Sequence, residues 1–100
     1  MLDDATLAGT VAAAMVGAVS TDHWPVVRRG LANVLALQDV TRAEAVEQQL
    51  ERTRAAVDEA GPADGRIRDA HRAAWGARIE VLLTDRPDLA DALRAVVAGG

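Results

Sequence analysis

The 100-residue chain has no cysteine, lysine, phenylalanine or tyrosine, and each absence narrows what it can be. Without cysteine there is neither a disulfide framework nor a cysteine-ligated metal site. Because Trp24 and Trp75 are the only aromatic residues, the core has to be built from Ala, Val and Leu, which favours closely packed helices over a sheet sandwich. Alanine also has the highest helix propensity of all residues. The composition therefore predicts one all-α domain.

The chain also lacks an excess of positive charge. Its formal net charge is −4, which opposes a nucleic-acid partner, because phosphates attract a basic surface. Asp3 and Asp4, rather than basic residues, precede the first apolar stretch. A secretory signal normally begins with positive charge, so we expect a cytoplasmic location.

Charge is missing altogether from residues 5–21, although about a quarter of the chain is charged. Within this stretch Ala5, Gly9, Ala13 and Gly17 recur at every fourth position. Such residues lie on one face of a helix, and ladders of small residues let helices associate closely in lipid. The bulkier members of the same segment are Leu7, Val11, Met15, Val16 and Val19.

Two locations suit this first helix. As the central helix of a bundle, it would be covered on all sides by its neighbours. In a bilayer, its 17 uncharged residues would span about 26 Å, slightly less than a ~30 Å hydrocarbon core. One copy is thus a marginal transmembrane helix, whereas several copies packed through the small residues would insert more readily.

The spacing of apolar residues and of helix-ending signals predicts five helices in one domain over residues 1–98, followed by a flexible tail at 99–100. We expect a four-helix bundle with a short additional C-terminal helix. The predicted helices are 3–20, 22–38, 41–60, 64–84 and a short one after Asp85. The expected N-terminal caps are Asp4, Asp22, Thr41 (in a capping box with Glu44) and Asp85.

A buried stripe is predicted on each helix. The expected core anchors are Trp24, Leu31, Leu50, Trp75 and Leu82. The inward positions of the fourth helix are expected to be Ile67, Ala70, His71, Ala74, Trp75, Ile79, Leu82 and Leu83. The third helix has a seam of Ala43, Val46, Leu50, Thr53, Val57 and Ala60. Its opposite face carries charges, interpreted as a solvated surface or alternatively a partner-binding one: Glu47, Glu51, Arg52, Arg54, Asp58 and Glu59.

No catalytic constellation is apparent. The only imidazoles, His23 and His71, fall on different helices, and no serine or threonine has a base arranged beside it. The glycines within the helices do not follow a strand, so they form no phosphate-binding loop. We expect no enzyme activity, no metal and no cofactor.

The whole chain resembles the Bell domain, a bacterial counterpart of the fungal HeLo domain and of the four-helix domain of the necroptosis executioner. The resemblance rests on the first helix, rich in Ala, Gly and Val, and on four later segments. These segments are Thr21-Asp22-His23-Trp24 leading to Val27-Arg28; Leu50-Glu51-Arg52-Thr53-Arg54; Ala74-Trp75-Gly76-Ala77-Arg78-Ile79-Glu80-Val81-Leu82-Leu83; and Asp85-Arg86-Pro87-Asp88-Leu89.

The resemblance implies an executioner of regulated bacterial cell death that permeabilises the inner membrane after it oligomerises. In the family, a nucleotide-binding receptor with a matching motif templates an amyloid signalling motif that follows the bundle; residues 1–100 contain no such motif. The implied partners are membrane lipids, further copies of the chain and that receptor. The implied insertion and oligomerisation helix comprises Leu2, Ala5, Leu7, Gly9, Val11, Ala13, Met15, Val16, Gly17 and Val19. The alternative is a non-enzymatic adaptor of a bacterial conflict system, which binds proteins through its third or fifth helix.

Overall fold

The computed structural model describes residues 4–37, 39–61 and 65–99, and all regular structure within these residues is helical. The predicted all-α fold is confirmed. Five α-helices and one 3₁₀ helix (η1) follow in the order α1 Asp4–Ala18, α2 Trp24–Leu35, α3 Val40–Ala60, α4 Gly65–Asp85, η1 Pro87–Leu89 and α5 Ala90–Gly99.

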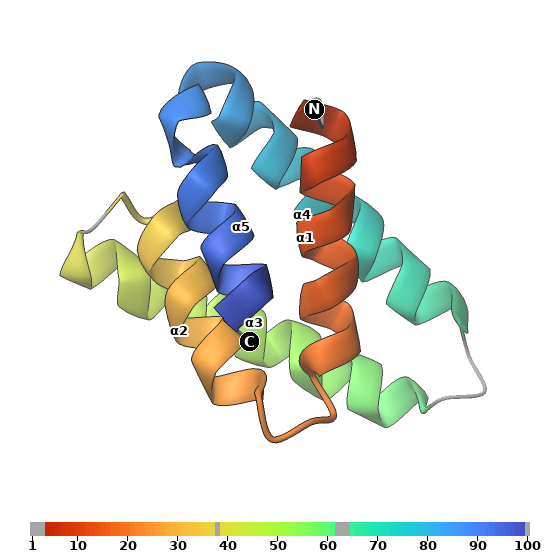
Figure 1. Ribbon diagram of the computed structural model, residues 1–100. Coiled ribbons are helices and arrows are strands. Elements are labelled where there is room, and N and C mark those ends of the chain that lie inside the picture. The colour runs from red at the N-terminus through yellow and green to blue at the C-terminus, as the bar shows by residue number, and fades with distance from the viewer. Residues whose placement is uncertain (1–3, 38, 62–64, 100) are drawn as a thin grey trace.

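The helices pack in two dominant pairs, α1 with α4 and α2 with α3. In Figure 1, α5 lies between α1 and α2, and α3 passes behind α2 and the C-terminal end of α5. The C-terminal end of α3 and the N-terminal end of α4 project beyond the other three helices, on the right of the view. The chain buries one side of α1, against α4, α5 and α2.

A single apolar core joins the five α-helices. Its largest fully buried side chains are Val11, Met15, Leu31, Leu50, Ile79, Leu83 and Leu93. Both tryptophans are buried in it, whereas Leu82, expected among the core anchors, is only half-buried at the rim. In α3 the predicted seam is buried from Ala43 to Val57, and Ala60 at its end is half-buried.

The polar residues that cap the helices differ from those predicted. Asp39, not Thr41, caps α3, because its carboxylate accepts the backbone N–H of Arg42 at 3.0 Å. At α2 the cap position is His23 rather than Asp22, and the His23 N–H donates to Oγ1 of Thr21 at 3.2 Å.

The helix ends also differ from their predicted positions. Asp85 is the last residue of α4 rather than the cap of a new helix, and Gly99 belongs to α5 rather than to a tail. α1 ends at Ala18, two residues earlier than expected, and α2 ends at Leu35 rather than near residue 38, which lies outside the described residues. The chain turns there through Leu37, which has a φ of 55°. Gly61, with a φ of 77°, ends α3 as predicted.

The first half of α4 is more exposed than predicted. Four residues of this half were expected to point inward, yet Ile67, Ala70 and Ala74 are exposed and His71 is only half-buried. The buried positions of α4 are Trp75, Ile79 and Leu83, which begin only at its middle. The reason is geometric, since this half of α4 extends past the helices that would cover it (Figure 1). Its apolar residues on the outer face therefore meet solvent.

Candidate functional site

Helix α1 carries two sets of residues with opposite environments. One set packs in the core and is at most 4% exposed: Leu7, Val11, Met15 and Val16 of α1, and Val19, which directly follows the helix. Ala5, Gly9, Ala13 and Gly17 are exposed instead. The prediction that α1 is covered on all sides is therefore wrong. The small-residue ladder faces solvent because larger side chains fill the core better. Leu2 lies outside the described residues.

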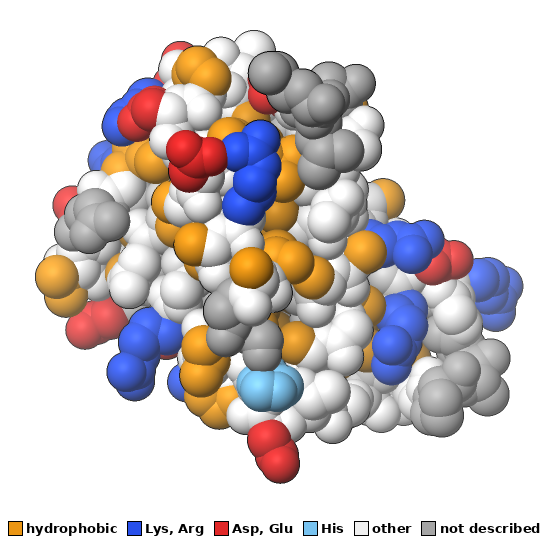
Figure 2. Space-filling view, in the orientation of Figure 1, with side chains coloured by type: hydrophobic (Ala, Val, Ile, Leu, Met, Phe, Trp, Pro, Cys, Tyr) orange, Lys and Arg blue, Asp and Glu red, His pale blue; other side chains and the backbone are white. Residues whose placement is uncertain are grey.

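The exposed ladder is an open helix face. A Cβ placed on Gly9 or Gly17 would have no heavy atom within 4 Å. The hydroxyl of Thr10 bonds back to the carbonyl of Thr6 at 2.9 Å, so the polar side chain on this face is satisfied within the helix. Figure 2 shows orange and white side chains over α1, with charged side chains beside α5 and at the edges. Another helix could thus approach the α1 backbone closely without burying a charge.

One side of the ladder borders α4, which approaches α1 very closely. A Cβ on Gly76 would lie 3.7 Å from Cβ of Ala12 and 3.9 Å from the carbonyl oxygen of Ala8. Beside this contact runs a shallow groove of about 410 Å³, floored by small residues of both helices and bordered by the side chains of Arg72 and Glu80. The ladder is therefore one wall of a groove and not an isolated stripe.

A second hollow lies behind α1, where it faces α2 and α5. Its volume is about 230 Å³ and its lining is mostly apolar, with Val11 and Met15 from α1 and Val96 and Val97 from α5. Next to it, α5 touches α2 where a Cβ on Gly30 would lie only 3.2 Å from Cγ2 of Val96. Helix α1 is thus packed tightly against α4 and less completely against α5.

The charged face of α3 is not simply solvated. Oε1 of Glu51 accepts hydrogen bonds from Nε1 of Trp24 and from a guanidinium nitrogen of Arg28, each at 2.6 Å. Its other oxygen accepts from Arg54 at 2.9 Å, and Arg54 also pairs with Asp58 at 2.9 Å. This cluster, the Glu51 cluster, joins α2 to α3.

The Glu51 cluster has a clear electrostatic consequence. The pKa of Glu51 is lowered from 4.5 to about 2, first by the hydrogen bond from Trp24 and further by those from Arg28 and Arg54, against the effect of burial. The hydrogen bond to Glu51 likewise raises the pKa of Arg28. Ser20, in the turn after α1, donates to Asp58 at 3.2 Å, which links that turn to the cluster. The cluster therefore positions α2 and the end of α1 on α3.

Trp75 is held in a similar way. Its Nε1 donates to Oγ1 of Thr53 at 2.9 Å, and the Thr53 hydroxyl donates in turn to the carbonyl of Gln49 at 3.2 Å. Both buried indole N–H groups are thus bonded to side chains of α3. The sequence analysis missed these bonds, although Trp24 and Arg28, four residues apart on one helix face, could have indicated a shared partner.

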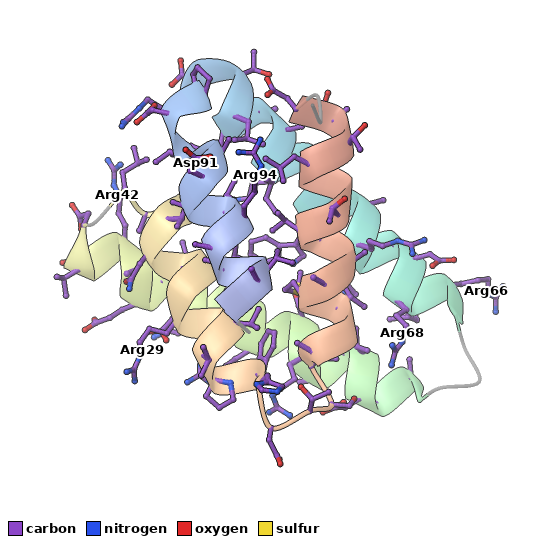
Figure 3. All side chains as sticks on the ribbon, viewed as in Figure 1. Arg29, Arg42, Arg66, Arg68, Asp91 and Arg94 are labelled. Carbon is purple, nitrogen blue, oxygen red and sulfur yellow. The ribbon has the colours of Figure 1, made fainter. Side chains whose placement is uncertain are left out.

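The remaining polar residues do not converge. The imidazoles of His23 and His71 lie on different elements, and in the part of the chain the structure describes no three metal-binding side chains come together. The arginines labelled in Figure 3 point away from one another, from α2, α3, α4 and α5, so they form no common basic patch. Among the same described residues, no helix is long and apolar enough to cross a membrane.

Compared with known proteins, the chain matches no family model, no curated protein and no solved structure. The exposed ladder of α1 is consequently the feature from which a function has to be inferred.

Proposed function

We propose that this chain is a membrane-targeting executioner of regulated bacterial cell death, a bundle of four helices with a fifth appended, activated when several copies are brought together. The observation that carries the proposal is the exposed, uncharged ladder of α1. A face of small residues that contains no charged side chain suits helix–helix association in lipid. The upstream partner in this proposal is a receptor that clusters the chain.

The buried side of α1 sets the conditions for activation. Burial of a large aliphatic side chain contributes about 1.5–3 kcal/mol, so the five core residues of α1 and its end together contribute on the order of 10 kcal/mol. That is comparable to the whole stability of a small domain. In water, α1 therefore stays in the fold, in the cytoplasm. A bilayer offsets the free-energy cost of removing α1 from the core, because lipid also accepts apolar side chains.

The length of α1 argues for insertion as an oligomer. Its 15 residues span about 22 Å, less than the ~30 Å hydrocarbon core of a bilayer. Because the ladder is already exposed at rest, copies can associate through it before α1 leaves the core. We therefore propose that association comes first and that several short helices then enter the inner membrane together, where they thin it locally.

The experiment is dye release from vesicles that contain anionic lipid, with the chain fused to a domain whose oligomerisation is induced by a small molecule. We expect release only after clustering. Gly9→Leu should reduce release strongly without unfolding the protein, because an added side chain at Gly9 meets open space. Glu59→Leu, at an exposed position of α3, is the matched control and should leave release unchanged.

Release that is unaffected by Gly9→Leu and Gly17→Leu would overturn the role of the ladder. Val11→Asp is not a useful variant, because Val11 is 1% exposed and an aspartate there would unfold the core. Circular dichroism of each variant before the assay separates lost folding from lost activity.

A second candidate is a helical adaptor that binds another protein through α3. Its supporting observation is a polar groove of about 460 Å³ beside the Glu51 cluster, lined by Arg28, Glu44, Glu47, Gln48, Glu51 and Arg52. The adaptor predicts no dye release at any degree of clustering. Since Glu51 also stabilises the fold, Glu44→Lys is the better probe of this surface, because Glu44 is exposed and forms no salt bridge among the described residues.

A further inference from the structure

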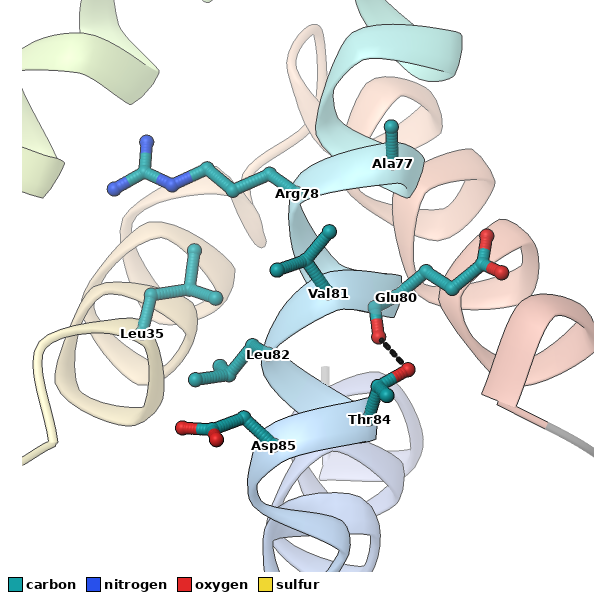
Figure 4. Close-up of a pocket in the computed structure, with 8 residues that line it drawn as sticks. All are labelled: Leu35, Ala77, Arg78, Glu80, Val81, Leu82, Thr84 and Asp85. Carbon is teal, nitrogen blue, oxygen red and sulfur yellow. Dashed lines mark hydrogen bonds between the residues drawn. The ribbon is translucent and has the colours of Figure 1, made fainter.

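Another groove adjoins the ladder groove on α4 and shares Ala77 and Glu80 with it, but no residue of α1 lines it. It runs between the end of α2 and the second half of α4, with a volume of about 840 Å³ (Figure 4). Leu35 faces it from α2, and Val81 and Leu82 face it from α4. Val81 is 71% exposed, which is unusual for a large aliphatic side chain within a helix.

The apolar wall of this groove continues along the outer face of α4. Ile67, Ala70, Ala74, Ala77 and Val81 follow a 3-4-3-4 spacing, and none of the five is buried. Residues at this spacing form one seam on a helix, of the kind that packs against a second helix. This seam lies away from the side of α4 that faces the core.

Charges of opposite sign mark the two ends of the groove. Arg78 and Asp85 are seven residues, or about two turns, apart and so lie on the same side of α4. The Arg78 guanidinium donates to Oε1 of Gln49 at 2.5 Å and lies 5.0 Å from the centre of the Trp75 ring. Within the described residues, neither Arg78 nor Asp85 forms a salt bridge. Each is available to an opposite charge from outside.

We propose that the partner in this groove is a second copy of the chain, with the last two turns of the two α4 helices, residues 78–85, antiparallel about a two-fold axis near Val81. In this arrangement Arg78 faces Asp85 of the partner subunit, and Asp85 faces Arg78 of the partner subunit. A two-fold interface uses the same patch twice, so the patch has to be complementary to itself. The pair Arg78 and Asp85, with apolar residues between them, meets that requirement.

The charges also select the orientation. Parallel helices in register would place Arg78 beside Arg78 of the partner subunit and Asp85 beside Asp85 of the partner subunit, and such like-charge contacts oppose association. The antiparallel arrangement pairs opposite charges at both ends and brings the two Val81 side chains together. This dimer is independent of the executioner proposal, because it does not use the α1 ladder.

The first test measures mass by sedimentation equilibrium over a range of concentrations. We expect reversible association to twice the 10.5 kDa of the chain. Val81→Asp should weaken it at least about tenfold, because it buries two like charges on the axis. Val26→Asp is the matched control, since Val26 is 58% exposed on α2 and does not line the groove, and it should leave association unchanged.

The second test exchanges the charges. Arg78→Asp and Asp85→Arg should each weaken the dimer, because each places two like charges together at both ends of the interface. The double variant should restore association, because the exchanged side chains again meet charges of opposite sign. Thermal unfolding of each variant reveals any loss of the intramolecular contacts of Arg78. Failure of the double variant to restore association, with the fold intact, would overturn the proposed pairing.

The third test uses the absence of cysteine. With Val81→Cys the only thiol lies near the axis, so oxidation should give a disulfide-linked dimer quickly, whereas Val26→Cys should not. A wild-type chain that remains monomeric at several hundred micromolar would overturn the dimer. A dimer abolished by Gly9→Leu but not by Val81→Asp would place association at the α1 ladder instead, which contradicts this inference and supports the proposed function.

Discussion

The indole of Trp24 donates a 2.6 Å hydrogen bond to the same Glu51 oxygen that accepts from Arg28. Trp24 and Arg28 are four residues apart on α2, so one carboxylate of α3 holds a full turn of the neighbouring helix. Because the carboxylate is bonded in its charged form, the packing of α2 on α3 depends on its ionisation.

The ionisation of Glu51 should make the free energy of unfolding depend on pH. The folded-state pKa of about 2 lies below the ordinary 4.5, so its contribution is complete above about pH 5 and is lost as pH falls towards 2. The Glu51 side chain is 35% exposed, so we discount this contribution for solvent screening to about 1–2 kcal/mol. Thermal unfolding between pH 7 and pH 2 measures it.

Glu51→Gln should unfold at lower temperature than the wild type at pH 7 and should lose less stability below pH 5. Glu44→Gln, at an exposed position of the same helix, should change neither quantity. Equal acid sensitivity of the wild type and Glu51→Gln would contradict the role of this carboxylate.

Thr53 should be needed for its hydroxyl and not for its size. Thr53→Val keeps the volume but removes the acceptor of the Trp75 N–H, and a buried donor left without a partner costs about 1–3 kcal/mol. Thr53→Ser retains the acceptor and should lose less. Urea unfolding compares the two variants, and an equally stable Thr53→Val would show that this hydrogen bond contributes nothing.

Glycines of α1 and of the turn after α3 should respond in opposite directions. Gly9→Ala should raise the free energy of unfolding by about 0.5–1 kcal/mol, because alanine favours the helix and its Cβ meets open space. Gly61→Ala should lower it by about 1–2 kcal/mol, because Gly61 has a φ of 77°. Chemical denaturation measures both; a destabilised Gly9→Ala would mean that the ladder is covered.

The start of α3 should depend on Asp39. Asp39→Ala removes the acceptor of the Arg42 N–H and should cost about 1 kcal/mol, whereas Asp39→Asn should retain most of the stability. Thr41→Ala is the control, because Thr41 lies inside the helix and should change little. Thermal unfolding decides between the two caps, and a larger loss for Thr41→Ala would favour the capping box.

Local sequence patterns predicted the helices well, because helix formation depends mainly on residues that are close together in the chain. The spacing from Val46 to Val57 was enough to place the buried seam of α3, and its predicted last residue, Ala60, is the observed one. Caps were less predictable, since Asp39 and Thr41 are both good capping residues and the choice depends on where the chain turns at Leu37.

The environment of an apolar residue was harder to predict because it depends on which helices reach it. The ladder on α1 and the residues Ile67, Ala70 and Ala74 of α4 are uncharged and regularly spaced, as buried positions are, yet none of them is buried. Periodicity identifies a face but not what covers it. The Glu51 cluster was missed for the related reason that it joins residues of two helices, at a distance along the chain that helical spacing does not describe.

The two indoles bond to separate positions of α3, one through α2 and the other through α4. Since tryptophan emission responds to its surroundings, a chain that keeps only Trp24 would signal optically when α2 leaves α3, and one that keeps only Trp75 would signal the departure of α4. The protein thus contains its own fluorescent reporters, with which the order of helix separation during unfolding can be timed without an added dye.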